Sequence, residues 1–364
     1  MALTKATHRM IEGASVNVKD FGAVGDGVTD DTVAIQAATA FKDVHFPEGT
    51  YIITAKININ HDIRITGHNA TIQGNTSSDA YFYIYGSIES ELAVSAVGVD
   101  SVTVTSSYDV GDLFIIRDDR DYSFSRHRDY YKKGEALTVE SNTGSVITTE
   151  ETLSASYTDF TNLKTVKINP VKVKIEGVTF TSTVATYALR LKYVKDSAIT
   201  DCKVLGGLNS ALSLAQSYNT AVTRSSLEHR GANIGYNYGI SIADSHYTRV
   251  SECSLFGTRH ATGLGGANEA TSVPCFHTVI ENCSLNNNYT QYVADIHGNC
   301  RDTFYIRNEI NGGIAISGEN CVYQYNKITS HIDRPSVDLV EIVGGDFKIY
   351  DNSIEVHKDP ASTI

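Results

Sequence analysis

The chain has 364 residues, a formal net charge of −12, no Trp, only five Pro, and many Tyr, Thr, Ser, Asn and Gly residues. This composition favours short strands joined by polar turns over a helical protein. The negative charge argues against a nucleic-acid partner, although a local cluster of Arg and His would still accept an acidic polysaccharide. No run of 18 apolar residues occurs, so we expect no membrane insertion. Six Cys without a CxxC pair predict buried free thiols, made in a reducing compartment.

The N-terminal region predicts a cap for a repetitive fold. In "DDTVAIQAA", Asp30 is expected to be the N-cap of a short helix, and Asp31 to lie in its first turn. Val33, Ile35 and Ala37–Ala38 would form an apolar face that closes the end of a solenoid. The stretch "VHFPEGTYIIT" that follows is typical of a first strand pair.

The middle region, residues 110–170, lacks the spacing of the later repeats and predicts an inserted β-rich module or a wide loop. Its segment "RDDRDYSFSRHRDYYKK" combines Arg, His, Lys and Tyr. Tyr rings stack on sugar rings and Arg binds carboxylates or phosphates, so the segment suits a carbohydrate ligand. A solvated loop or a contact between subunits explains the same residues equally well.

A six-residue pattern recurs through the second half, as in "ITDCKV", "VSECSL", "IENCSL" and "YIRNEI", with a small or amide residue at its fourth position. The fourth position returns every 18 to 30 residues and reads Glu176, Cys202, Ser225, Cys253, Cys283, Asn308, Asn326 and Asn352. A strand of alternating apolar and small or polar residues precedes it, as in "ALSL" and "GISI". The repeat predicts a parallel β-helix with an inward stack of Cys and ladders of Asn at a turn.

The stretch "VNVKDFGAVGDGVTDDTVAIQAA", together with "FPEGTY", resembles the opening of the pectate-lyase-like right-handed β-helix superfamily, in the form common in bacteriophage tailspike and appendage proteins. The lead-in "LTKATHRMIEGA" is similar to a segment that precedes this domain in many phage tail proteins. The resemblance implies a homotrimeric spike of the virion, made in the host cytoplasm and joined to other tail proteins through its N-terminus. It also implies extracellular action on a bacterial surface polysaccharide, such as a capsule or an O-antigen.

The expected fold is all-β, a right-handed parallel β-helix with an N-terminal capping helix and a β-rich insertion. The expected organisation follows the chain: a lead-in or connector (residues 1–20), the cap and first β-helix turns (21–109), the insertion (110–170), the main β-helix turns (171–357) and a tail (358–364).

The sequence "YVADIHGNC" places an acid and an imidazole in one of the repeating strands. Counting back 13 or 14 residues from the fourth positions aligns Asp295 with Ala188, Ala211, Gly239 and Gly313. Ile296 then points inward, and Asp295 and His297 point outward on one face. The alignment predicts a groove floor of small residues that carries one acid.

A second acid is expected beside the first. The same count from Cys283 reaches Glu269, which would place it one rung from Asp295, roughly 5 Å away. Two carboxylates at that distance do not both ionise freely, so one would act as a general acid for cleavage of a glycosidic bond. Asp244, one turn earlier, is the alternative partner.

Cations and imidazoles gather in the same turns. These candidate substrate-binding residues are His229, Arg230, His246, Arg259 and His260. Arg259 would bind a carboxylate or phosphate of the substrate, while His260 and His297 would orient or share a proton. The combination of "RHATG" with "DIHGN" is also similar to segments of phage tailspikes and neck appendages.

Three functions fit these residues. The first is an endoglycosidase that uses Asp295 and Glu269 and needs no cofactor or metal. The second is a polysaccharide lyase with a His base and Arg259. A lyase of this kind could use Ca²⁺ as a cofactor. The third is a non-catalytic spike that only binds its receptor glycan.

Overall fold

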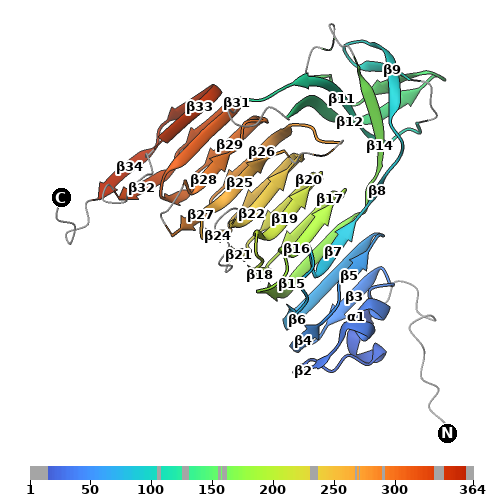
Figure 1. The fold of residues 1–364 in the computed structure, drawn as a ribbon, viewed down its shortest axis with the longest axis vertical. Helices are drawn as coiled ribbons and strands as arrows, with labels where there is room; N and C mark the ends of the chain where they lie inside the picture. The colour runs from blue at the N-terminus through green and yellow to red at the C-terminus, as the bar shows by residue number, and fades with distance from the viewer. Residues whose placement is uncertain are drawn as a thin grey trace.

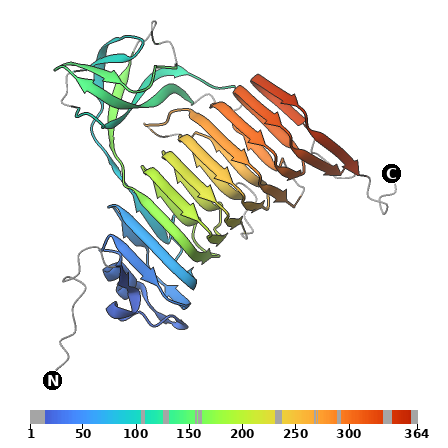
Figure 2. The same ribbon diagram turned by 180° about the vertical axis from the view of Figure 1, so that it is seen from behind.

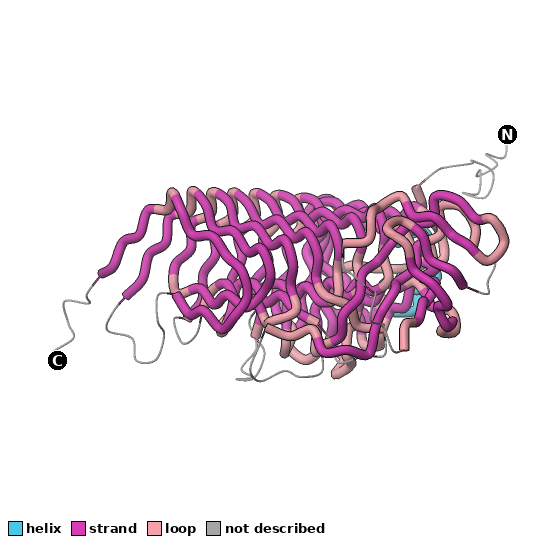
Figure 3. Tube along the Cα trace, turned by 90° about the horizontal axis from the view of Figure 1, so that it is seen from above, coloured by secondary structure: helices cyan, strands magenta, loops and turns pink. Residues whose placement is uncertain are grey.

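The structure, a computed structural model, describes residues 15–104, 108–124, 131–154, 157, 162–229, 237–266, 269, 271–288, 292–331 and 340–357. A sheet of 27 strands winds through most of this chain as a right-handed parallel β-helix (Figures 1 and 2). Figure 3 shows its successive turns as near-copies stacked along one axis. Within the described part of the chain, no helix is long and apolar enough to cross a membrane.

Each complete turn contributes one strand to each of three faces. The first face contains β5 (Ile57–Ile59), β7 (Phe82–Tyr85), β16 (Tyr187–Lys192), β19 (Ser210–Ala215), β22 (Tyr238–Ala243), β25 (His260–Gly265), β28 (Ala294–Ile296) and the starts of β31 (Ile314–Gln324) and β33 (Val340–Tyr350).

The second face contains β1 (Val16–Asn17), β3 (Asp43–Phe46), the starts of β6 (Ile63–Gly74) and β15 (Val173–Ser182), then β17 (Lys195–Thr200), β20 (Tyr218–Thr223), β23 (His246–Ser251), β26 (Cys275–Glu281), β29 (Cys300–Ile306) and the ends of β31 and β33.

The third face contains β2 (Asp26–Asp30), β4 (Gly49–Ile53), the ends of β6 and β15, then β18 (Lys203–Gly206), β21 (Ser226–Glu228), β24 (Ser254–Gly257), β27 (Ser284–Asn287), β30 (Glu309–Asn311), β32 (Lys327–His331) and β34 (Ser353–His357).

A column of polar side chains runs along the turn between the second and third faces. This column, the turn ladder, consists of Cys202, Ser225, Cys253, Cys283, Asn308, Asn326 and Asn352. The backbone N–H of each residue donates to the side chain of the next, for example from Cys283 to Asn308 Oδ1 at 2.9 Å. The residue before each one has a left-handed backbone conformation, with φ between 47° and 57°. The predicted Cys stack and Asn ladder are confirmed, and all six Cys are free and buried.

The N-terminal end of the coil is covered by the short 3₁₀-helix η2 (Val18–Phe21) and by α1 (Thr32–Ala38) (Figure 1). The N-cap of α1 is Asp31 rather than Asp30, and the Asp31 carboxylate accepts from the backbone of Val24 at 2.6 Å. The helix buries Ala34, Ile35 and Ala38, whereas Val33 is 82% exposed. The capping helix and the burial of Ile35 and Ala38 are therefore confirmed, but the helix starts one residue later than predicted, and Val33 and Ala37 are exposed rather than part of its apolar face.

A second, antiparallel sheet of seven strands lies between β7 and β15. It contains β8 (Ser87–Ile88), β9 (Leu92–Val97), β10 (Ser101–Val104), β11 (Leu113–Asp121), β12 (Lys132–Asn142), β13 (Val146–Thr149) and β14 (Lys164–Asn169). The insertion thus begins near residue 87 and not at residue 110, because β8, β9 and β10 already belong to the antiparallel sheet.

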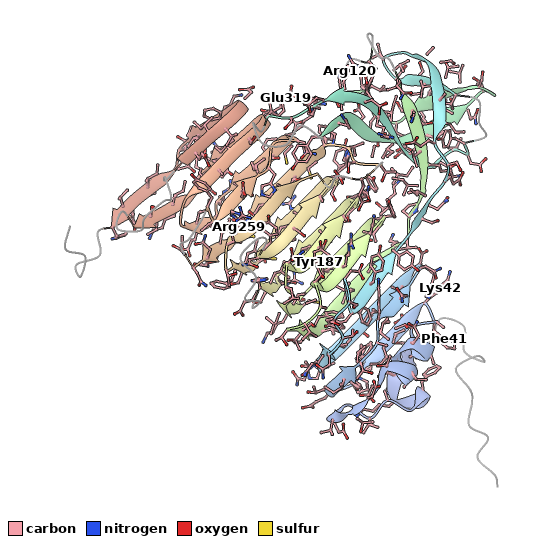
Figure 4. The ribbon with its side chains drawn as sticks, viewed as in Figure 1. Phe41, Lys42, Arg120, Tyr187, Arg259 and Glu319 are labelled. Carbon is pink, nitrogen blue, oxygen red and sulfur yellow. The ribbon has the colours of Figure 1, made fainter. Side chains whose placement is uncertain are left out.

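The insertion has its own apolar core and is docked on the coil. Its docking face buries Leu113, Ile115, Ala136, Val166 and Ile168 against Tyr193, Tyr218 and Val273 of the coil. Further contacts lead toward the later turns, where the backbone N–H of Phe124 donates to Gly298 O at 2.6 Å and Tyr122 donates to Glu319. Figure 4 labels Glu319 and Arg120 on the two sides of this approach. The module therefore stands over one margin of the coil.

Candidate functional site

A groove of about 480 Å³ crosses the first face of the coil. Its floor is made by two columns of small outward side chains, Ser213, Ser241 and Gly263 beside Ala215, Ala243 and Gly265. Larger side chains form its walls and ends: Tyr131, Tyr187, Arg190, Gln216, Tyr238, Asp244, Arg259, Glu269 and His297. Tyr187 and Arg259 are labelled in Figure 4. The predicted groove with a floor of small residues therefore exists.

The residues of that floor differ from the predicted ones. Asp295 lies in one column with Arg190, Ser213, Ser241, Gly263 and Ala315. The predicted partners Ala188, Ala211, Gly239 and Gly313 were each two residues too early. A shift by an even number keeps the same face, so the prediction that Ile296 points inward is confirmed by its 1% exposure.

Glu269 is not on the rung next to Asp295, so that part of the prediction was wrong. Gly263 takes this position, and Glu269 lies in the loop between β25 and β26. Its carboxylate forms an ion pair of 2.7 Å with Lys192. Burial opposes the charge on Lys192, but the hydrogen bond to Glu269 raises the pKa of the ammonium above its usual value. The ion pair joins the end of β16 to the loop between β25 and β26.

Three side chains form a compact Asp–His cluster at the end of the groove floor: His260, Asp295 and His297. Asp295 Oδ2 lies 2.6 Å from His297 Nε2 and 3.2 Å from His260 Nε2. These ligand-type atoms all lie within 4.8 Å of one another, close enough to hold a metal ion. Asp295 and His297 therefore meet on one face as predicted, and His260 joins them.

The environment of His260 fixes its ring. The side chain is completely buried, and Nδ1 makes a hydrogen bond with Tyr292 O. The Tyr238 ring stacks on it at 5.4 Å between centroids and 15° between planes. Burial lowers the pKa of His260 to about 4, although the nearby Asp295 acts in the opposite direction. The ring is therefore neutral at physiological pH.

Asp244 follows β22 with a left-handed φ of 51° and is 1% exposed. Its Oδ2 accepts a hydrogen bond of 3.1 Å from Ser272 Oγ. A Cβ on Gly266 would lie 2.9 Å from Oδ1, so glycine at this position leaves room for the carboxylate. Asp244, the predicted alternative partner, is a buried acid in the groove wall.

The other predicted site residues divide between the groove and its surroundings. Arg259 lines the groove. His229 is buried between Leu208 O and Thr258 Oγ1, outside the residues that line the groove. His246 is 1% exposed and accepts from the backbone of Ala136 in the insertion, so it joins the two modules instead of facing the groove. Arg230 lies outside the described residues.

Sequence reasoning missed five of the larger groove residues: Tyr131, Tyr187, Arg190, Gln216 and Tyr238. Arg190 stands in the column of Asp295, so a count corrected by two residues would have found it. Tyr187 and Tyr238 begin β16 and β22, outside the four-residue core of the repeat. Tyr131 comes from the insertion, and no periodicity in the sequence connects it with the coil.

Two family models match the chain. Residues 205–364 match the model described as "Gp49, pectin lyase-like", and residues 15–107 match "Rhamnogalacturonase A/epimerase, pectate lyase-like". With the observed coil, these matches make the chain a right-handed β-helix protein of the pectate-lyase-like superfamily. Phage tailspikes are among the similar solved structures, and together with the family models they support a tailspike of this superfamily.

The tailspike protein gp49 from Pseudomonas phage LKA1 is 25% identical, with a TM-score of 0.81, over 93% of this chain and 64% of that protein. The gp54 tailspike of Acinetobacter baumannii bacteriophage AP22, solved with a capsular saccharide, is 22% identical with a TM-score of 0.80. That match covers 94% of this chain and 58% of the tailspike, so the chain spans about three fifths of both structures.

A short likeness to a curated enzyme also exists. A probable glucan endo-1,3-beta-glucosidase of Arthroderma benhamiae is 52% identical over 56 residues, which is 14% of this chain and 6% of the fungal protein.

Proposed function

We propose that the protein is a tailspike depolymerase, which binds a bacterial surface polysaccharide in the groove and cleaves it. The observation that carries the proposal is the groove itself, a floor of small residues that ends at the Asp–His cluster. Its rungs repeat at about 4.8 Å, so a linear glycan would lie along the column from Arg190 to Asp295. Tyr187, which is partly exposed at the groove, supplies an aromatic face for a sugar ring.

In the proposed reaction the glycosidic bond is hydrolysed. A carboxylate that accepts from one imidazole nitrogen leaves the other nitrogen as a base, so Asp295 would orient His297 to activate water. Asp244 would protonate the leaving oxygen. Glu269 would not be the general acid, because an ion-paired carboxylate is a poor proton donor. Its role would be the ion pair with Lys192.

The second candidate is β-elimination at a uronic acid. The hydrogen bond between His297 and Asp295 favours it, because the same base would remove the proton beside a carboxylate. Arg259, in the groove wall, would then neutralise the carboxylate of the substrate. In this scheme Asp244 and Glu269 would have no part in proton transfer, and Ca²⁺ would be a possible cofactor.

Assembly is part of the proposal. By likeness to the tailspikes, the protein would act outside the cell as a homotrimer of the virion, after synthesis in the host cytoplasm. Its N-terminus would bind other tail proteins. Light scattering of the purified chain coupled to size exclusion tests the trimer, and a monomeric mass would contradict it.

The test incubates the full chain with capsules, lipopolysaccharide O-chains and teichoic acids, and follows reducing ends and ultraviolet absorbance together. New reducing ends without an absorbing product support hydrolysis, whereas an absorbing product supports elimination. Asp295→Asn should abolish either signal. The matched control is Asp351→Asn, an exposed acid at the turn between the second and third faces, which should cleave normally. Equal cleavage by both variants would contradict the proposed site.

A further inference from the structure

The Asp–His cluster contains a buried nitrogen whose partner is missing. Tyr292 O can only accept a hydrogen bond, so Nδ1 of His260 carries the ring proton and Nε2 presents a lone pair. That lone pair faces Asp295 Oδ2 at 3.2 Å. Nevertheless, Nε2 makes no hydrogen bond to any residue that the structure describes. A buried acceptor in this situation is destabilising unless another group satisfies it.

The chemistry of the three side chains indicates what that group is. Two acceptor atoms at this distance repel each other, and a cation between them removes the repulsion. We propose that His260, Asp295 and His297 bind one divalent transition-metal ion, with Zn²⁺ as the best match, at the end of the groove. The inference concerns the ligand set alone and does not rest on the proposed glycan cleavage.

The donor set selects the class of ion. Two imidazole nitrogens and one carboxylate are a common set for Zn²⁺ in sites that keep a further position open. Ca²⁺ prefers six to eight oxygen ligands, so two imidazoles disfavour it. Tetrahedral Zn²⁺ separates its ligand atoms by roughly 3.3 Å. The two distances from Asp295, 2.6 and 3.2 Å, lie close to this value, and all three ligand atoms lie within 4.8 Å of one another.

The surroundings already hold the ligands in place. Metal-binding imidazoles usually donate their second N–H to a carbonyl or a carboxylate, and His260 does so to Tyr292 O. Tyr238 stacks on His260 and meets the edge of His297, with 5.9 Å between the latter two rings. His297 also lines the groove, so a free coordination position would open on the groove side.

A second buried polar group lies beside the cluster. Asn299 is 1% exposed, and neither of its side-chain polar atoms has a hydrogen bond among the described residues. A Cβ on Gly265 would lie 2.7 Å from His297 Cβ and 3.5 Å from Asn299 Oδ1, so both side chains lie close to the same glycine. A water molecule on the ion would give this amide a partner.

The experiment uses the full chain without a histidine tag, stripped of metal by a chelator. Titration with Zn²⁺ against a chromophoric chelator should give one ion per chain. Asp295→Asn and His297→Gln should each weaken binding by about 100-fold or more, since each removes a ligand. The matched control is His277→Asn, an exposed imidazole with a φ of 54° that Asn tolerates, and it should bind as the parent does.

A second readout guards against variants that fail to fold. Co²⁺ added to the stripped parent protein should produce visible absorption bands of a nitrogen–oxygen site, and His297→Gln should remove them. Less than one ion per chain, equal affinity in the parent and in both ligand variants, or equal affinity for Ca²⁺ would each overturn the proposal. No glycan is present in these titrations, so their failure and a failure of the cleavage proposal remain distinguishable.

Discussion

Two polar columns on the same coil have opposite properties. In the turn ladder, every rung from Cys202 to Asn352 presents a small or amide side chain, and each satisfies the backbone N–H of its neighbour. In the groove column, Arg190 is followed by two Ser and a Gly, and then by Asp295. The first column repeats one interaction, whereas the second does not.

The difference separates stability from function in this fold. A polar group that repeats along a β-helix is satisfied by its own copies and contributes to the stack. A polar group that appears once has no copy on the next rung, so other elements must supply its partners. Asp295 finds one in His297, and His260 lies beside the pair, which is the arrangement expected of a functional site.

The largest expected effect comes from the groove column. Asp295→Asn should lower the rate of glycan cleavage by about 10²–10⁴-fold, because the His297 ring loses the carboxylate that orients it. Reducing-end assays on a cleaved glycan measure the rate. The midpoint of thermal unfolding should change little, and a protein that loses activity only by unfolding would contradict the comparison.

Acid should weaken the joint between the insertion and the coil. Burial lowers the pKa of His246 to about 3, and its Nδ1 accepts from the backbone of Ala136 while Nε2 lies 3.1 Å from Pro274 O. The folded state therefore resists protonation that the unfolded chain accepts below about pH 6.5. The contribution of neutral His246 to the free energy of unfolding is fully present above that pH. It falls by about 1.4 kcal/mol per pH unit as the pH drops toward 3.

Urea unfolding at several pH values measures this loss. His246→Gln keeps both hydrogen-bonding functions without a titrating group, so it should flatten the profile between pH 6.5 and pH 4. An unchanged profile in the variant would assign the acid sensitivity to other groups.

Breaking the turn ladder should cost stability but not activity. Asn326→Ala removes the acceptor of the Asn308 backbone N–H at 2.9 Å and the donor to Tyr305 O at 2.9 Å. Two buried groups lose their partners, which should destabilise the fold by about 3 kcal/mol. Thermal unfolding measures the loss. Asn352→Ala, on the half-buried last rung, is the matched control and should lose less, while cleavage by both folded variants should equal that of the parent.

The smallest effect is expected at the groove rim. Glu269→Gln removes the ion pair with Lys192. The Glu269 side chain is 36% exposed and the Lys192 side chain 14%, so the free energy of unfolding should change by less than about 1 kcal/mol. Cleavage should fall by less than about tenfold, as judged by reducing ends at saturating glycan. A 100-fold loss would restore the carboxylate pair inferred from the sequence and would remove the contrast between Asp295 and its neighbours.

The sequence predicted the coil well because its signal is local and repeated. The six-residue pattern fixed the turn ladder, and the alternation in "DIHG" placed Asp295 and His297 on one face. It failed where the position depends on loop length. Glu269 was located by counting through a turn that contains the long loop between β25 and β26. The extra residues of that loop made the counted position wrong. The prediction that His246 binds substrate was wrong for another reason. Its hydrogen-bond partner, Ala136, comes from the insertion, which the repeat does not place.

The turn ladder also bears on how such a protein can be altered. Its residues stay aligned from turn to turn at one corner of the coil, although the turns differ in length by up to twelve residues, from 18 to 30. The extra residues leave the coil at other corners, as in the loop that carries Glu269 beside the groove. Loops of other lengths could therefore be grafted around an unchanged scaffold, so that the groove walls can change while the stack keeps its alignment.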